Sequence, residues 1–203
     1  MSIIQKLADM VGVTPQVFII TIVVLVIAFI LIWIKISIDE KKGVNSQEKE
    51  EIRKIVGNLV PDGVQYTAAY AHSKEVYGGA HMRREVYHYY AVGFRPDQAD
   101  HIWVIPIGVE GGKIVYTEPV RASAENLAYV GGGAYELLLK FPGKRDNFIK
   151  LTVDESNTKL GKECRVNIQQ PDEAKAWKPF AEAFQTGVNA ALGVDKKGRA
   201  LRN

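Results

Sequence analysis

Residues 17–34 read VFIITIVVLVIAFILIWI, and this stretch decides how the whole chain is organised. It carries no charge, and Thr21 is its only aliphatic side chain that can form hydrogen bonds. An apolar stretch without a polar face does not form an ordinary surface helix. As a helix it is roughly 27 Å long, close to the roughly 30 Å hydrocarbon core of a bilayer. The stretch therefore predicts one transmembrane helix.

The membrane segment is expected over residues 15–38. Thr14 and Pro15 are typical residues for an N-cap and a first helical position. Near the C-terminal end of the segment, the long side chain of Lys35 can extend to the lipid headgroups. A transmembrane helix is favoured over a cleaved signal peptide, whose apolar core is shorter and precedes a small-residue cleavage site. It is also favoured over a buried core helix, which is usually shorter. The predicted anchor residues are Val17, Phe18, Leu25, Phe29 and Trp33.

Basic residues flank this segment unevenly. Only Lys6 precedes it, whereas six basic residues follow within twenty positions. Positively charged flanks stay in the cytoplasm, so residues 1–14, with a possible interfacial helix, are expected outside and the C-terminal domain inside. The net charge of +3 is too small to indicate nucleic-acid binding. The six residues are Lys35, Lys41, Lys42, Lys49, Arg53 and Lys54.

The charged linker over residues 39–63 is expected to contain a juxtamembrane helix over residues 46–58. Ile52, Val56 and Leu59 fall on one face of it. That stripe either rests on the following domain or drives self-association, so a homo-oligomer is possible. Pro61-Asp62-Gly63 is a strong turn signal at the entry to the domain.

Between residues 64 and 170 the periodicity changes to two, which predicts about seven short strands. The stretch 119–130 is compatible with loop, strand or short helix. In the last candidate strand Cys164, Val166 and Ile168 face one way, which makes Cys164 a small core residue. The strands are expected at 64–71, 85–94, 101–109, 112–118, 134–141, 147–153 and 163–169.

The last predicted element is an amphipathic helix that begins at Pro171 and ends before Gly193. Trp177 and Phe184 belong to its apolar stripe, and Pro179 suggests a late start or a kink. The basic tail over residues 193–203 is expected to be disordered.

Seven strands followed by one long amphipathic helix, with Trp177 early in that helix, resemble the pleckstrin-homology-like fold. The resemblance covers residues 64–192 and rests on element order. It implies a bent, partly open barrel that the helix closes at one end. A β-sandwich with a packed helix remains the alternative.

The resemblance also implies a role for the predicted loop over residues 72–85. Lipid-binding members of that fold carry basic phosphate ligands in the first hairpin loop, and Lys74, Arg83 and Arg84 are available here. Glu75 and Glu85 dilute this charge, so a plain solvated hairpin is the competing interpretation.

No other pattern in the sequence predicts a catalytic or metal-binding site. The spacings of the four histidines match no compact metal-ligand pattern, and nucleophile-elbow and phosphate-loop motifs are absent. We therefore expect no catalytic residues, no cofactor and no metal. The histidines, His72, His81, His88 and His101, are expected on the surface or in the core.

These observations favour a non-catalytic, single-pass membrane adaptor or accessory subunit. Its helix holds it in the bilayer, and its domain meets protein partners at the cytoplasmic face. One alternative is a lipid or small-ligand sensor that uses the 72–85 loop. Another is a hydrolase or metal enzyme.

Overall fold

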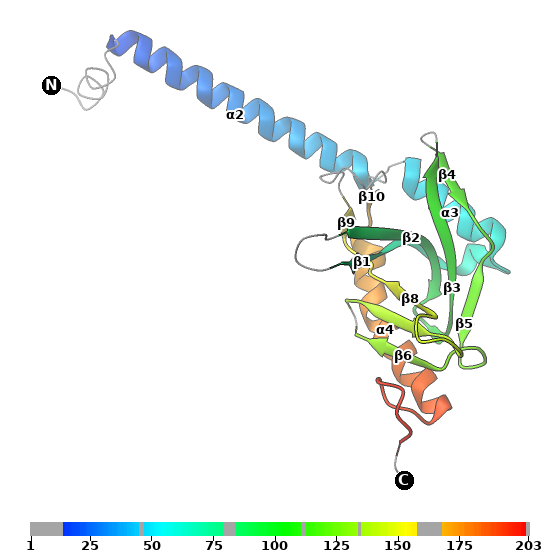
Figure 1. The fold of residues 1–203 in the computed structure, drawn as a ribbon. Coiled ribbons are helices and arrows are strands. Elements are labelled where there is room, and N and C mark those ends of the chain that lie inside the picture. Colours follow the sequence, from blue (N-terminus) through cyan, green and yellow to red (C-terminus); the bar gives the residue numbers. More distant parts are fainter. Residues whose placement is uncertain are drawn as a thin grey trace. The chain divides into compact units, whose positions relative to one another are not determined.

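The computed structural model of the protein describes residues 14–44, 47–78, 84–110, 113–133, 135–157 and 168–201. Contacts divide the chain into two compact units, Met1–Gly43 and Val44–Asn203. The first unit contains almost all of helix α2, Pro15–Val44. The second contains the sheets and the remaining helices (Figure 1).

Helix α2 begins at the residue predicted from the sequence. The hydroxyl of Thr14 lies 3.5 Å from the backbone nitrogen of Val17, so Thr14 is the N-cap residue ahead of Pro15. The side chains described over residues 20–34 are all exposed. Within the described residues, no helix is long and apolar enough to cross a membrane.

The second unit is mostly β, as predicted, and its strands pair antiparallel throughout the described residues. Five strands form the larger sheet in the order β1-β2-β3-β4, with β5 also paired to β3. A second sheet has the order β6-β7-β8, and β9 pairs with β10. The larger sheet contains β1 Thr67–Tyr77, β2 Arg84–Arg95, β3 Gln98–Glu110, β4 Lys113–Tyr116 and β5 Val120–Ser123. The others are β6 Tyr129–Gly132, β7 Leu137–Lys140, β8 Phe148–Leu151, β9 Ser156–Asn157 and β10 Ile168–Gln169.

Strand alternation gives the larger sheet two buried faces. Ala71, Val92 and Val104 belong to a core that also contains inward-facing residues of β6, β7 and β8 and the apolar stripe of helix α4, Pro171–Leu192. Their neighbours Tyr70 and Ala91 belong to a second core on the opposite face. Because successive side chains of a strand point to opposite faces, the sheet is covered on both sides.

Helix α3, Gln47–Leu59, covers this second face. Ile52, Ile55 and Val56 are buried there against the sheet. A helix is therefore present where one was predicted over residues 46–58, and its apolar stripe rests on the domain. The self-association alternative loses its basis, because the stripe is already buried against the sheet.

Helix α4 runs without interruption from Pro171, so the suggested late start at Pro179 is wrong. Trp177 and Phe184 are fully buried, as predicted. Gly193 ends the helix in the left-handed conformation, with φ 66°, and its N–H reaches the carbonyl of Ala190.

The expected disorder of the tail is wrong up to Leu201. Val194 and Ala200 form an antiparallel bridge, and the Asp195 carboxylate accepts the backbone N–H groups of Lys197 and Arg199. Hydrogen bonds from Arg199 hold the pKa of Asp195 at about 2. A Cβ at Gly198 would lie 2.5 Å from the Tyr129 ring, so the turn packs closely against β6.

Several strand boundaries also differ from those predicted. Residues 63–65 form a short 3-10 turn, η1, and β1 then continues through Tyr77. The stretch left open at 119–130 supplies β5 and the start of β6. Of the last predicted strand, only Ile168 and Gln169 are described, and Cys164 and Val166 lie outside the described residues.

Candidate functional site

The predicted basic loop is largely a regular ribbon in the structure. Lys74 lies in β1 and Arg84 begins β2, where Tyr77 pairs with Arg84. The prediction of a loop from residue 72 is therefore wrong, because the two strands stay paired for five residues beyond it. Arg83 lies outside the described residues.

The Lys74 ammonium already has partners within this ribbon. It lies 2.8 Å from a Glu85 carboxylate oxygen and 5.4 Å from the centre of the Tyr87 ring. The hydrogen bond with Glu85 raises the pKa of Lys74. Arg84 is exposed. The structure therefore does not gather the three predicted basic residues into a described anion site.

The predicted anchor residues lie along α2. Val17, Leu25, Phe29 and Trp33 are all exposed, with 66% of both Phe29 and Trp33 accessible. The side chain of Phe18 is outside the described residues. Large apolar side chains exposed along successive helical turns form a continuous apolar surface whose contact with water is unfavourable.

A hydrogen-bonded chain that the sequence analysis missed joins β3 to η1. The Tyr66 hydroxyl lies 2.6 Å from Nε2 of His101, and Nδ1 of His101 lies 2.8 Å from the Asp100 carboxylate. If Nδ1 donates to Asp100, then Nε2 accepts the proton of Tyr66. Burial raises the pKa of Asp100, but the hydrogen bond with His101 and its charge outweigh burial and hold that pKa below its ordinary value.

This chain borders a shallow cavity of about 410 Å³ between α3, η1 and the first turn of α4. Its charged residues are Arg53 and Glu173, which lie 3.5 Å apart. A carboxylate–imidazole–hydroxyl chain can activate a nucleophile, but a phenol is a poor one at neutral pH. We therefore assign these three hydrogen-bonded residues a structural role: Tyr66 and Asp100 provide partners for both ring nitrogens of the buried His101. The remaining lining residues are Gly57, Gly63, Val64, Tyr66, Thr67 and Ala68.

The other histidines lie apart from this chain. His72 stacks on Tyr70 and lies 3.8 Å from the Asp154 carboxylate. His88 is exposed on β2, and His81 lies outside the described residues. Among the described residues, no group of three or more His, Cys, Asp or Glu side chains could hold a metal ion.

Two buried carboxamides hold α4 against strand edges, and sequence reasoning missed both. The Gln170 side chain accepts the Tyr70 N–H and donates to the Tyr70 carbonyl, both at 2.8 Å. Asn189 does the same for Val130, at 2.8 and 2.7 Å. Each side-chain amide therefore makes the two backbone hydrogen bonds that a neighbouring strand would otherwise make with Tyr70 of β1 or Val130 of β6. No local pattern in the sequence indicates either contact, because the bonded residues lie 100 and 59 positions apart in the chain.

Comparisons with protein-family models, with curated proteins and with solved structures found no match.

Proposed function

We propose that this protein is a non-catalytic, single-pass membrane adaptor or accessory subunit with a cytoplasmic β domain. The observation that carries the proposal is the run of large apolar side chains exposed along α2. Such a surface needs a non-aqueous environment, and a bilayer supplies one on every side of a helix.

The proposed membrane span depends on the complete sequence from Val17 to Ile34. This sequence has no charge, and α2 continues beyond it at both ends. Among the described residues no helix is long and apolar enough to cross a membrane, so the span is proposed from the sequence. The orientation follows from the excess of basic residues after the span.

The order of the elements also supports a pleckstrin-homology-like domain. One meander, β1 to β4, is followed by a second, β6 to β8, and then by α4. A bridge between His72 and Thr152 joins the two sheets, and α4 packs into the core between them. This agrees with a partly open barrel closed by its C-terminal helix.

One feature favours protein binding over lipid sensing at the first hairpin. Lys74 is neutralised by Glu85, whose carboxylate lies 2.8 Å from its ammonium group. An anionic headgroup would have to compete with this carboxylate. The lipid-sensor and enzyme alternatives therefore rank below the adaptor.

Purification of the full chain from membranes in mild detergent tests the adaptor proposal. We expect a protein partner to co-purify in a fixed molar ratio and to remain bound through size-exclusion chromatography. A chain that is extracted from the membrane alone under these conditions, at physiological salt, would contradict the proposal.

A further inference from the structure

A groove of about 330 Å³ lies between the C-terminal half of α4, the start of β3 and the residue that follows β5. Its walls are mostly small residues, which leave the space between these elements unfilled. The nearest atom that a Cβ at Gly187 would meet is the Ala99 carbonyl oxygen, 3.8 Å away. The groove can therefore admit an apolar side chain from outside. Its lining residues are Ala99, Asp100, Ala124, Gly187, Val188 and Ala191.

The helix surface beside the groove lacks the charges that a water-exposed helix normally carries. Residues 183–193 contain no Asp, Glu, Lys or Arg, although Ala183, Gly187 and Ala191 are exposed. The outer face of a surface helix is usually charged or polar. This half of α4 is therefore better suited to a protein contact than to water. The charged residues of α4 all lie before it, at Asp172, Glu173, Lys175, Lys178 and Glu182.

Asp100 adds a negative charge to the groove. Its side chain is 58% exposed, and its carboxylate lies 2.8 Å from Nδ1 of His101, a ring that is neutral when Nε2 accepts the Tyr66 hydroxyl. In the part of the chain that the structure describes, no Lys or Arg nitrogen lies within 4.0 Å of this carboxylate. The nearby Arg121 is paired with Glu125 at 2.9 Å. The groove therefore favours an occupant that combines an apolar side chain with a positive charge.

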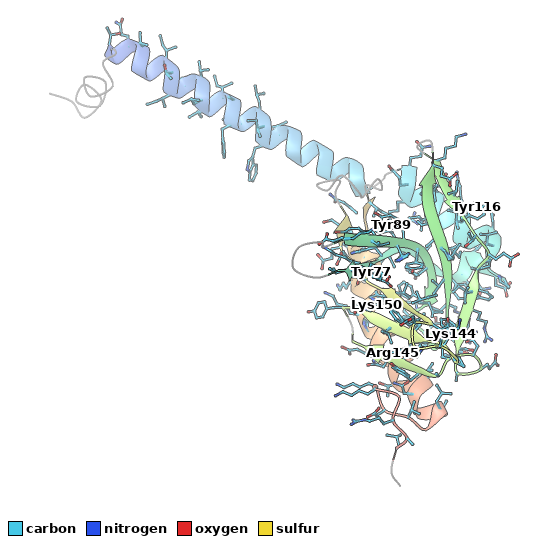
Figure 2. All side chains as sticks on the ribbon, viewed as in Figure 1. Tyr77, Tyr89, Tyr116, Lys144, Arg145 and Lys150 are labelled. Atoms are coloured by element: carbon cyan, nitrogen blue, oxygen red, sulfur yellow. The ribbon has the colours of Figure 1, made fainter. Side chains whose placement is uncertain are left out.

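The C-terminal tail of the same chain carries this combination. Leu201 is 55% exposed and does not line the groove of its own chain. Its N–H donates to the Gly193 carbonyl at 2.9 Å, which holds it close to the end of α4 that forms the groove. Lys196 and Lys197 are exposed, and neither ammonium has a carboxylate within 4.0 Å among the described residues. Figure 2 shows long side chains projecting from this tail.

We infer that the groove is occupied by the tail of a second copy of this chain. Leu201 of one copy enters the apolar part of the other copy's groove, and Lys196 and Lys197 lie on the side of Asp100. Because the groove and Leu201 are neighbours on one surface, a two-fold axis between them forms both contacts at once, and the assembly closes at two copies. The proposed membrane anchor would raise the effective concentration of the copies, so a small interface suffices.

Disulfide crosslinking between two copies of the full chain tests this contact. Two differently tagged forms are co-expressed, and both carry Cys164→Ala, which removes the only native cysteine. One form has Ala191→Cys in the groove and the other has Leu201→Cys, and copper phenanthroline is added to the lysate before any detergent. We expect a disulfide-linked dimer that contains both tags.

The control pair uses Lys175→Cys in place of Ala191→Cys. Lys175 is exposed on the same helix, about four turns before the groove. This pair should give little crosslinked dimer. Equal yields from the two pairs, or no dimer from the pair with Ala191→Cys, would overturn the inference.

Substitutions without cysteine should weaken the same dimer. Leu201→Ala should weaken it about a hundredfold, because each dimer loses two buried leucine side chains. Val64→Ala is the matched control, since Val64 is 91% exposed and lines the other cavity. Asp100→Asn should have a smaller effect, because it removes the charge and keeps an acceptor for His101. Energy transfer between labelled full-length chains, diluted stepwise in lipid vesicles, measures all three, and equal dimerisation of Leu201→Ala and Val64→Ala would contradict the contact.

This dimer goes beyond the proposed adaptor function and does not depend on it. A chain that crosslinks through Ala191→Cys and Leu201→Cys but co-purifies with no other protein would keep the dimer and lose the adaptor function. A partner that co-purifies with a chain that does not crosslink would overturn the dimer and leave the adaptor function intact.

Discussion

Gln170 illustrates how much of the fold depends on single polar residues. Its side chain is buried and makes three hydrogen bonds, two to Tyr70 and one to the carbonyl of Asp154 at 2.9 Å. The sequence placed Gln170 at the end of a strand and gave no reason to bury it. Its partners lie up to 100 residues away in the chain, and local periodicity carries no information about them.

Replacing Gln170 by Leu should lower the free energy of unfolding by about 1–3 kcal/mol. The change leaves the backbone groups of Tyr70 buried without partners, and it keeps a similar side-chain volume. Gln185→Leu is the control, because Gln185 is half-buried and its two bonds to carbonyls are long, at 3.3 Å each. Chemical denaturation of a fragment that begins at Val44 measures both. Equal losses for the two variants would contradict the role given to Gln170.

His72 should make stability depend on pH. Burial lowers the pKa of His72 below its ordinary value, and the Asp154 carboxylate opposes this only in part. The unfolded chain therefore binds a proton at a higher pH than the folded chain does, so stability falls as the pH drops below about 6.5. His72→Gln should remove this part of the pH dependence. Denaturation between neutral and mildly acidic pH checks it, and an unchanged slope would refute the assignment.

At the scale of elements, the contact between α3 and α4 depends on a buried ion pair. The Lys49 ammonium lies 2.9 Å from the Glu173 carboxylate, with 10% and 9% of the two side chains exposed. It also donates to the Gln169 carbonyl at 3.3 Å. This pair fixes α3, which follows the proposed membrane span, to the first turn of α4.

Lys49→Met should cost about 3 kcal/mol, because it leaves Glu173 buried with only the longer contact to Arg53. The double variant Lys49→Met with Glu173→Leu should recover most of that loss, since no uncompensated charge remains. Arg53→Met is the control and should cost less than about 1 kcal/mol, because Arg53 is largely exposed. A double variant as unstable as Lys49→Met would show that the charge pair is not the cause.

The apolar stripe of α4 should be essential to the domain. Trp177→Ala or Phe184→Ala removes a fully buried ring that packs against Phe180, at a cost of about 3–5 kcal/mol. Glu182→Ala, at an exposed position of the same helix, should have little effect. Thermal melting of the fragment that begins at Val44 compares the three. If the ring variants melt like Glu182→Ala, then α4 does not close the core.

Elements with strong local signals were predictable from the sequence, and elements defined by distant contacts were not. Thr14-Pro15, Pro171 and Gly193 marked helix ends correctly because capping chemistry is local. The sequence did not decide between strand, loop and helix for β5 and β6. Each has only four residues, and its pairing partners are determined by the tertiary fold. The extension of β1 and β2 beyond residue 72 was missed because polar residues in a paired ribbon look like a loop.

The chain combines an apolar helix, α2, with a β domain whose larger sheet packs against α4 on one face and α3 on the other. The sequence identified the apolar run and the C-terminal helix, and it left open whether the apolar stripe of α3 packs on the domain, as it does in the structure, or on a second copy.

The proposed membrane anchor and cytoplasmic domain can be tested with a reporter that is fused after Asn203 and is active only in the cytoplasm. We expect an active reporter that stays with the membrane fraction after alkaline extraction, because basic residues after the proposed span would keep the domain in the cytoplasm. Replacing Lys41, Lys42 and Lys54 by Gln should reduce that activity without touching the buried Lys49. An inactive reporter on the outer side, or a chain released by alkali, would contradict the account.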